Sequence, residues 1–150
     1  MSTNRLEIAA PPAAVFAVLM DARAYADWVV GSKRIRAVDD NWPAVGARFH
    51  HTVGAPGVDI DDSSKLVEVE TNRRVVLEVR FRPAGIGVVS LDLEPKSEGR
   101  RTLVTMTEHP QSGAVRRWWS PALDALTHAR NAYSLRRLAR LSERRAASTR

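Results

Sequence analysis

The chain has 150 residues, a length that fits one domain with a hydrophobic core of its own. It contains no cysteine, which excludes disulfides, a thiolate nucleophile and zinc sites with sulfur ligands. The net charge is +6, and residues 116–150 hold nine arginines against Asp124 and Glu143. The basic excess therefore belongs to the C-terminal part of the chain.

Alternation of apolar and polar residues predicts about seven β-strands, and the clearest is 75–81, with Val75, Leu77 and Val79 on one face and Glu78 and Arg80 on the other. Short turns separate the last four strands, so we expect an antiparallel meander. The predicted strands are residues 3–9, 33–39, 48–53, 58–70, 75–81, 86–93 and 102–108.

Helical spacing occurs near both ends of the chain. Val15, Phe16 and Leu19 share a face and predict a short helix over residues 12–20, and a second short helix is expected over 22–28. Ser120 followed by Pro121 combines an N-cap residue with proline at the first helical position. We therefore expect a long helix from residue 120 to about 145.

One stripe of this long helix is apolar at its ends and polar in its middle. Two interpretations remain open: the polar residues lie at the edge of the buried face, or this part of the helix faces a cavity. The stripe consists of Leu123, Thr127, Asn131, Ser134, Leu138 and Leu141.

The order of the elements is a strand, two short helices, six strands and one long helix. It does not alternate strand with helix, as a parallel sheet would require, so the predicted class is α+β. An antiparallel sheet has one face to cover, and only the long helix has the length to cover it. We expect a curved sheet around this C-terminal helix, with the two short helices closing one end.

Four motifs carry a resemblance to a known superfamily: Ala10-Pro11-Pro12-Ala13-Ala14-Val15-Phe16, Tyr25-Ala26-Asp27-Trp28, Val45-Gly46 and Arg130-Asn131. In these the chain resembles the START-like or SRPBCC superfamily, in particular its small bacterial members that are often labelled polyketide cyclase/dehydrase-like. The resemblance implies a helix-grip fold in a single domain over residues 1–150, with a helical tail to about residue 145. It also implies a deep cavity between the sheet and the C-terminal helix.

Members of this superfamily include lipid and sterol carriers, hormone receptors and polyketide cyclases, so the fold alone leaves the function open. The first hypothesis is a binding or transport protein for a small hydrophobic or aromatic molecule, such as a lipid or a polyketide-like metabolite. The alternative is a cyclase or dehydratase that acts in the same cavity. No cofactor is expected, since the chain lacks a Walker loop, a dinucleotide fingerprint and a G-x-S-x-G motif.

His50 and His51 are adjacent, so they point to opposite faces of their strand. His51 shares its face with Phe49 and Val53, which favours the interior for His51. A histidine there could act as a general base or donate a hydrogen bond to a ligand, because its pKa lies near neutrality. The alternative is a hydrogen-bonded histidine of the core or the surface.

Glu108 ends the strand that points Val104 and Met106 inward, and Arg130 is its candidate partner. This arrangement favours a structural ion pair, with a catalytic acid as the alternative. Weak catalytic candidates are therefore His51 and Glu108. The residues expected around a ligand are Trp28, Phe49, His51, Leu77, Val79, Phe81, Met106, Glu108, Thr127, Arg130, Asn131 and Ser134.

Asp61, Ser63 and Lys65 fall on one face of their strand with Val67 and Val69, so they lie either in a polar part of the interior or beyond its rim. The acidic residues of this segment lack the glycine and glutamate spacing of a calcium loop, and we expect no metal.

Trp118 and Trp119 precede the long helix and are candidates for a lid over the cavity; the alternative is that they pack on the core. No apolar run reaches the ~18 residues of a membrane span, and residues 1–7 lack an export signal, so we expect a cytoplasmic chain without stable membrane insertion. The basic helix could bind phosphates or an anionic membrane, or its arginines could simply be solvated. We expect no specific nucleic acid partner, and either a monomer or a homodimer.

Overall fold

The structure is a computed structural model that describes residues 2–81 and 85–149, with the side chains of Phe81 and Val115 excepted. The predicted binding residue Phe81 thus lies outside the described side chains. Seven antiparallel strands form one sheet in the order β1-β7-β6-β5-β4-β3-β2. The strands are β1 (Ser2–Ile8), β2 (Ser32–Val38), β3 (Arg48–Val53), β4 (Ile60–Glu70), β5 (Arg74–Phe81), β6 (Gly85–Lys96) and β7 (Arg101–Ser112).

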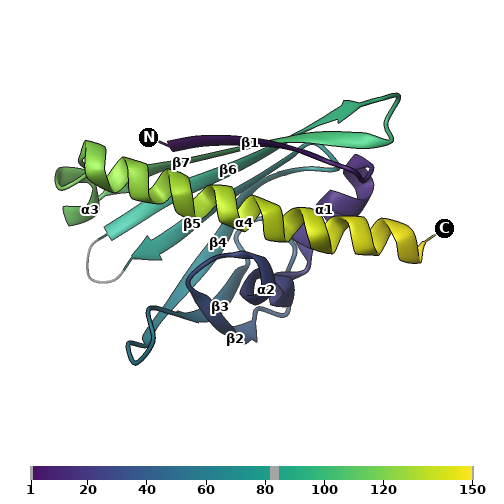
Figure 1. Cartoon of the computed structure of the whole chain (residues 1–150). Coiled ribbons are helices and arrows are strands. Elements are labelled where there is room, and N and C mark those ends of the chain that lie inside the picture. Colours follow the sequence, from purple (N-terminus) through teal and green to yellow (C-terminus); the bar gives the residue numbers. More distant parts are fainter. Residues whose placement is uncertain (1, 82–84, 150) are drawn as a thin grey trace.

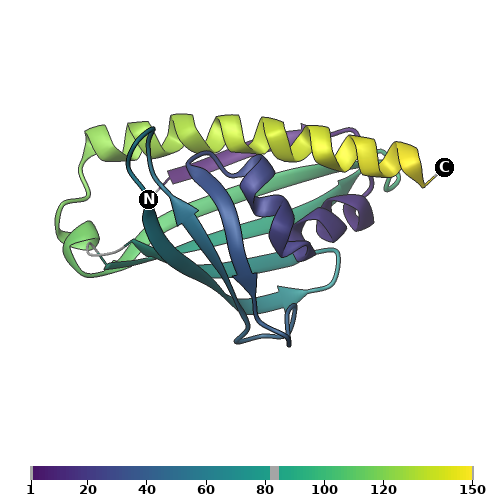
Figure 2. The same cartoon turned by 90° about the horizontal axis from the view of Figure 1, so that it is seen from below.

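The longest helix covers the sheet. Figures 1 and 2 show α4 (Pro121–Ser148) running along the full length of one sheet face, with the first two short helices beneath it toward one end and α3 (Ala114–Arg117) at the opposite end, where α4 begins. The Ser120 hydroxyl accepts a hydrogen bond from the Leu123 backbone N–H, so the predicted N-cap is present. The other helices are α1 (Pro12–Met20), a 3₁₀ turn (Ala22–Ala24), α2 (Tyr25–Trp28) and α3 (Ala114–Arg117). The predicted helix-grip α+β fold is confirmed.

Two strands are longer than their sequence patterns predict, because each continues through a proline. Pro95 in β6 lies beyond the first residue pair of β5, Arg74 with Asp92. Pro110 in β7 lies beyond the last residue pair with β1, Ser2 with Glu108. Each proline therefore stands where the strand on one side has ended, so its missing N–H leaves no ladder bond unmade.

A β-bulge in β4 changes which of its residues point inward. Ser64 is opposite Val79 and Leu66 is opposite Leu77, but the register then shifts before Glu68, which is opposite Val76. The extra residue reverses the alternation along the strand. Of the two alternatives for Asp61, Ser63 and Lys65, the polar interior face is therefore wrong, because the residues that point inward before the bulge include Ser64 and Leu66.

The buried core lies between the sheet and the helices. Its fully buried side chains include Ile8 and Val104 from the sheet, Leu19 from α1, and Leu135 and Leu138 from α4. These apolar contacts fill the end of the molecule that α1 closes. The described part of the interior is less completely filled toward the other end, where α4 passes over β5, β6 and β7.

Candidate functional site

A cavity of about 330 Å³ lies between α4, α2 and the inner face of the sheet. This volume is at the lower end of the range for small-molecule sites, which are concave and mostly apolar. The wall is formed mainly by apolar side chains, including Val29, Leu77, Val89 and Met106. Most of the predicted binding residues line it: Trp28, Phe49, His51, Leu77, Val79, Met106, Glu108, Arg130 and Asn131. Their role in binding stays a prediction.

Aromatic side chains from α2 and β3 form one wall. The ring centroids of Tyr25 and Phe49 are 4.7 Å apart, those of Tyr25 and Trp28 are 5.0 Å apart, and those of Phe49 and His51 are 5.4 Å apart. The Tyr25 hydroxyl donates to the Leu19 carbonyl at 2.8 Å, and burial raises the pKa of Tyr25 well above its usual value. Tyr25 is therefore a neutral phenol that fixes this wall in place.

His51 lies on the inner face, as its alternation predicts, while His50 contacts Asp39 on the other face at 3.1 Å. The Nε2 atom of His51 is 3.2 Å from the Ser64 hydroxyl. Its Nδ1 atom is buried and has no partner among the residues that the structure describes. Burial lowers the pKa of His51 below its usual 6.5; the carboxylate of Asp62 opposes this effect and the charge of Arg36 adds to it. The ring is thus neutral at pH 7.

This lowered pKa predicts a pH-dependent loss of stability that the His51→Gln variant should reduce. The unfolded chain takes up the proton near pH 6.5, whereas the folded chain takes it up only at lower pH. The free energy of unfolding should therefore fall as the pH drops below 6.5, with a slope from this residue of at most about 1.4 kcal/mol per pH unit. Urea titrations of both proteins between about pH 7 and pH 5 measure the slope. His128→Gln, at an exposed position, is the control, and an unchanged slope in His51→Gln would contradict the assignment.

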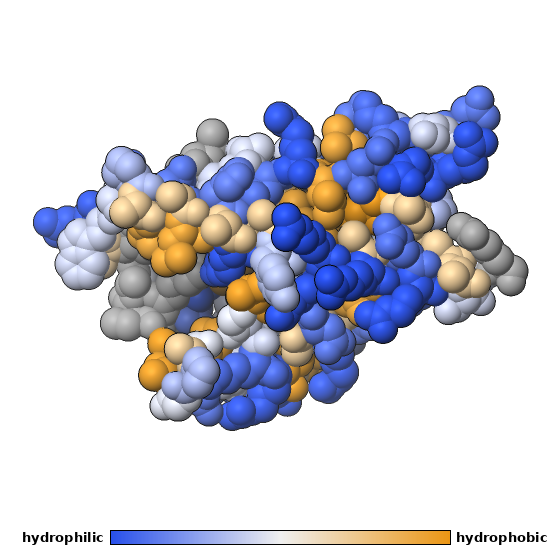
Figure 3. Space-filling model, viewed as in Figure 1, coloured by the Kyte–Doolittle hydropathy of each residue, from blue (hydrophilic) through white to orange (hydrophobic). Residues whose placement is uncertain are grey.

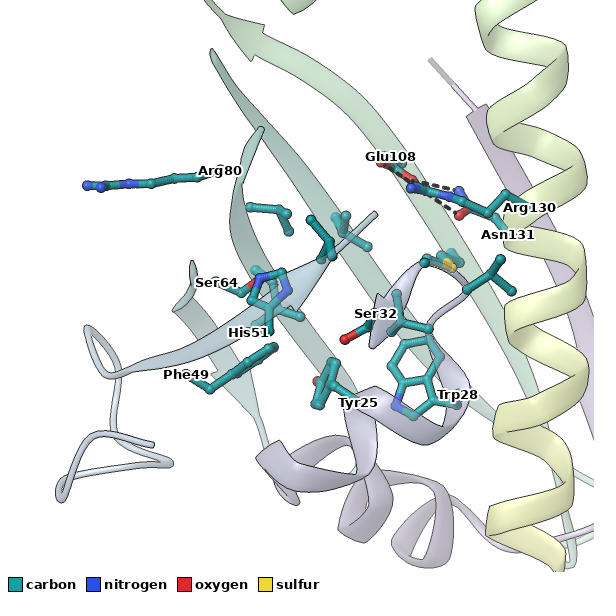
Figure 4. Close-up of a pocket in the computed structure, with 18 of the residues that line it drawn as sticks. Tyr25, Trp28, Ser32, Phe49, His51, Ser64, Arg80, Glu108, Arg130 and Asn131 are labelled. Carbon is teal, nitrogen blue, oxygen red and sulfur yellow. Dashed lines mark hydrogen bonds and ion pairs between the residues drawn. The ribbon is translucent and has the colours of Figure 1, made fainter. Parts of the chain in front are cut away.

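A second polar group joins β7 to α4. Glu108 is almost fully buried, and both of its carboxylate oxygens accept from Arg130 Nη2, at 2.9 and 2.6 Å. Asn131 Nδ2 donates to Glu108 Oε2 at 2.8 Å. Figure 4 shows these three side chains together on one side of the cavity, opposite His51 and Ser64, while Arg80 extends away. The expected ion pair between Glu108 and Arg130 is therefore present in the cavity wall.

Several polar atoms in the residues around the cavity lack a protein partner. Trp28 Nε1, Ser32 Oγ, His51 Nδ1 and Arg130 Nε are buried and form no hydrogen bond within residues 2–81 and 85–149. All four side chains line the cavity. Buried polar groups are nearly always hydrogen-bonded, and an ordered water or a ligand in the cavity could supply partners that the described residues do not.

Four predicted site residues lie away from the described lining. The Ser134 hydroxyl accepts a hydrogen bond from the Val30 backbone N–H at 3.0 Å. This bond ties α4 to the loop that follows α2. Thr127 is buried near β1, where Asn4 donates to the carbonyl of His128. Trp118 is 74% exposed, and Trp119 Nε1 donates to Asp124 at 2.9 Å, so neither tryptophan is among the lining residues. Their role as a lid stays a prediction.

Sequence reasoning missed Tyr25, Ser32 and Ser64. Tyr25 stands in a motif that the sequence links only to the family resemblance, and its ring forms part of the aromatic wall. Ser32 begins β2, at a position where a serine usually indicates only a turn. Ser64 points inward because of the bulge in β4, which has no marker in the sequence.

An antiparallel sheet, a long C-terminal helix and a cavity between them define a helix-grip domain. The chain belongs to the family described as polyketide cyclase / dehydrase and lipid transport, whose model matches residues 2–143. Together with its structural neighbours, this match confirms the resemblance to the START-like or SRPBCC superfamily. Among curated proteins, none matches the chain.

Solved structures share the fold at low sequence identity. A protein from Chromobacterium violaceum is 21% identical with a TM-score of 0.67, covering 94% of this chain and 97% of its own. A START superfamily protein from Mycobacterium smegmatis is 14% identical with a TM-score of 0.66, over 99% and 97% of the two chains. The chain also matches 51% of StfQ, a di-domain ARO/CYC from the steffimycin biosynthetic pathway, at 16% identity and a TM-score of 0.68, over 97% of this chain.

None of the helices in the described residues combines the length with the apolar composition that crossing a membrane requires.

Proposed function

We propose that this chain binds a small apolar molecule that carries at least one oxygen atom, inside the cavity under α4. The observation that supports this most is the set of buried, unpartnered polar atoms on Trp28, Ser32, His51 and Arg130, counted within the described residues. The Trp28 and Arg130 atoms are N–H donors, and the Ser32 hydroxyl can donate as well. A ligand with a carbonyl or other acceptor oxygen would supply the partners that they lack.

Affinity would come mainly from the apolar wall. Leu77, Val89 and Met106 offer hydrocarbon surface, and each Å² of apolar area removed from water stabilises the complex by about 25 cal/mol. The polar atoms would add orientation, because a hydrogen bond forms only when the ligand oxygen reaches them.

The family description supports this proposal, since it names both polyketide chemistry and lipid transport. StfQ, which shares the fold, is an ARO/CYC protein from a biosynthetic pathway. Polyketide-like compounds combine apolar rings with carbonyl oxygens, which is the combination that the cavity offers. A plain hydrocarbon chain would leave the polar atoms unpartnered.

The first test is native mass spectrometry of the purified chain, followed by organic extraction and accurate mass of anything released. A stoichiometric, oxygen-containing apolar molecule is expected. A second test uses a matched pair of probes, 2-acetylnaphthalene and 2-ethylnaphthalene, which differ in one ketone oxygen. We expect the ketone to bind about tenfold more tightly, since one net hydrogen bond contributes about 1 kcal/mol or slightly more.

The same pair of probes gives a prediction for Ser32→Ala. The variant should reduce the preference for the ketone and leave the binding of 2-ethylnaphthalene unchanged, because it removes a hydroxyl and little apolar surface. Fluorescence titration measures both constants. Ser90→Ala, in β6 and outside the described cavity lining, is the matched control. Equal binding of the two probes by the unmodified chain would contradict the proposed role of the polar atoms.

A second candidate function is a cyclase or dehydratase reaction in this cavity. It rests on His51, whose ring is neutral at pH 7 and contacts the Ser64 hydroxyl, and could therefore accept a proton from a substrate. Glu108 could assist only if it were released from Arg130. Turnover of a model polyketone that persists in the His51→Gln/Glu108→Gln double variant would reject these residues as the acid and the base.

A further inference from the structure

Exposed apolar side chains gather on the face of the molecule that carries α4. Leu126 on α4 is 67% exposed, Val58 in the hairpin between β3 and β4 is 51% exposed, and Tyr133 and Ile60 are also exposed. Figure 3 shows hydrophobic surface over the first half of α4 and over this hairpin on the same side of the molecule. Most soluble surfaces scatter such residues singly, so a group of them calls for an explanation.

The two parts of this apolar surface lie on either side of the entrance to the cavity. Gly31 and Gly54 line the cavity next to the hairpin and are exposed or half-buried, and Arg130 lines it on α4 with a third of its side chain exposed. The Gly54 N–H donates to the Gly31 carbonyl at 3.0 Å, which ties the hairpin to the rim. A Cβ at Gly54 would collide with the Val58 carbonyl, so glycine permits this fold of the hairpin.

Arginines flank the α4 part of this surface along the chain. Arg116 and Arg117 precede Trp118, and the outer face of α4 changes from Leu126 and Tyr133 to exposed arginines at positions 136, 140 and 144. The guanidinium of Arg137 lies 4.9 Å above the Tyr133 ring. Between residues 116 and 149 the chain has eight arginines and two acidic residues. On the hairpin, the exposed acids Asp59 and Asp61 are paired with Lys33 and Arg36 at 2.6 and 3.5 Å, so the unbalanced positive charge lies along α4. An apolar centre with a basic flank is the pattern of surfaces that bind anionic membranes.

We propose that this face docks on an anionic lipid bilayer, with Leu126 and Val58 at the level of the acyl chains and the arginines on lipid phosphates. The entrance of the cavity would then face the membrane. A second copy of the chain fits this surface less well, because paired copies would bring their arginines together. Nucleic acid offers phosphates for the arginines but no apolar layer for Leu126, Val58 and Ile60.

The proposal is tested by cosedimentation of the unmodified chain with two kinds of vesicle, phosphatidylcholine alone and phosphatidylcholine with phosphatidylglycerol. Binding to the anionic vesicles is expected to be at least about tenfold tighter, since each arginine near an anionic surface contributes about fivefold. Raising the salt concentration should weaken this binding, because exposed charges are screened. No cavity ligand is needed, so the result does not depend on the proposed function.

Matched variants separate the docking face from general effects on the surface. Leu126→Glu and Val58→Glu should each weaken vesicle binding by about tenfold or more, through lost apolar contact and added negative charge. The control is Val45→Glu, since Val45 is 61% exposed in the loop between β2 and β3, which Figure 2 shows on the side away from α4. Arg136→Glu with Arg140→Glu should abolish the preference for anionic lipid, and Arg100→Glu, in the turn between β6 and β7, should not.

Three outcomes would overturn the proposal. One is equal binding to neutral and anionic vesicles. Another is an effect of Val45→Glu as large as that of Leu126→Glu. The third is absence of vesicle binding. A concentration-dependent dimer that Leu126→Glu dissociates would then assign the face to a second copy of the chain. Tight binding of a DNA duplex that Arg136→Glu removes would assign it to nucleic acid.

Discussion

Arg130→Met is expected to destabilise the fold by about 3 kcal/mol, because it leaves a buried carboxylate with a single strong donor. Glu108 is only 3% exposed. Of the two side chains that donate to it among the described residues, only Asn131 would remain in the variant. Breaking a buried pair costs about 3–5 kcal/mol, and we expect the lower end because a third of the Arg130 side chain is already exposed, so that water can enter. Methionine retains most of the apolar stem, which limits the loss of packing. Urea denaturation measures the change in the free energy of unfolding.

The double variant Arg130→Met/Glu108→Gln tests the cause of this loss. Without the carboxylate there is no uncompensated charge, so the double variant should be more stable than Arg130→Met by about 2 kcal/mol. Arg101→Met is the matched control: its partner Glu7 is 3.3 Å away, and the two side chains are 40% and 46% exposed, so the pair is well solvated. That variant should lose no more than about 1 kcal/mol. A double variant as unstable as Arg130→Met would mean that packing of the arginine stem, and not its charge, holds the site.

Local patterns in the sequence predicted the elements of this fold well. The N-cap at Ser120 placed the start of α4 correctly, since an N-cap depends on residues adjacent in the chain. The alternation through Val75 and Leu77 predicted the bounds of β5 to within one residue. Alternation also placed His51 on the inner face of its strand, which the structure confirms. The periodicity of apolar residues and the capping residues depend on neighbours in the sequence, so they can be interpreted without the tertiary structure.

What the sequence did not predict depends on contacts between distant segments. The bulge in β4 reverses the alternation and brings Ser64 beside His51, yet a bulge arises from pairing with β5 and leaves no mark in β4 alone. The sequence likewise does not predict which residues of the polar stripe of α4 face the cavity. Asn131 faces it, whereas the Ser134 hydroxyl, one turn later, accepts a hydrogen bond from the Val30 N–H. Which turn of a helix lies over a cavity is decided by the crossing of helix and sheet, which periodicity does not specify.

Val79→Trp is expected to abolish ligand binding while the fold is kept. The indole ring would occupy the cavity and cover the apolar wall against which the ligand packs, so the affinity for 2-acetylnaphthalene should fall by about 100-fold or more. Val79 lines the cavity and is only half-buried, and its neighbour across the strand pair on β6 is Gly87, so no side chain there crowds the larger ring. We expect a change in the free energy of unfolding of no more than about 1–2 kcal/mol, the range in which mild overpacking falls.

Fluorescence titration with this probe measures the loss of binding, and the far-UV circular dichroism spectrum checks that the sheet is intact. Val45→Trp adds the same ring at an exposed position and should bind the probe as the unmodified chain does. The comparison of the two variants tests where the ligand binds, because both carry one added indole and differ only in whether that indole lies in the cavity. A folded Val79→Trp chain with undiminished affinity would put the binding site elsewhere, and the unpartnered atoms of Trp28 and Ser32 would then belong to buried water.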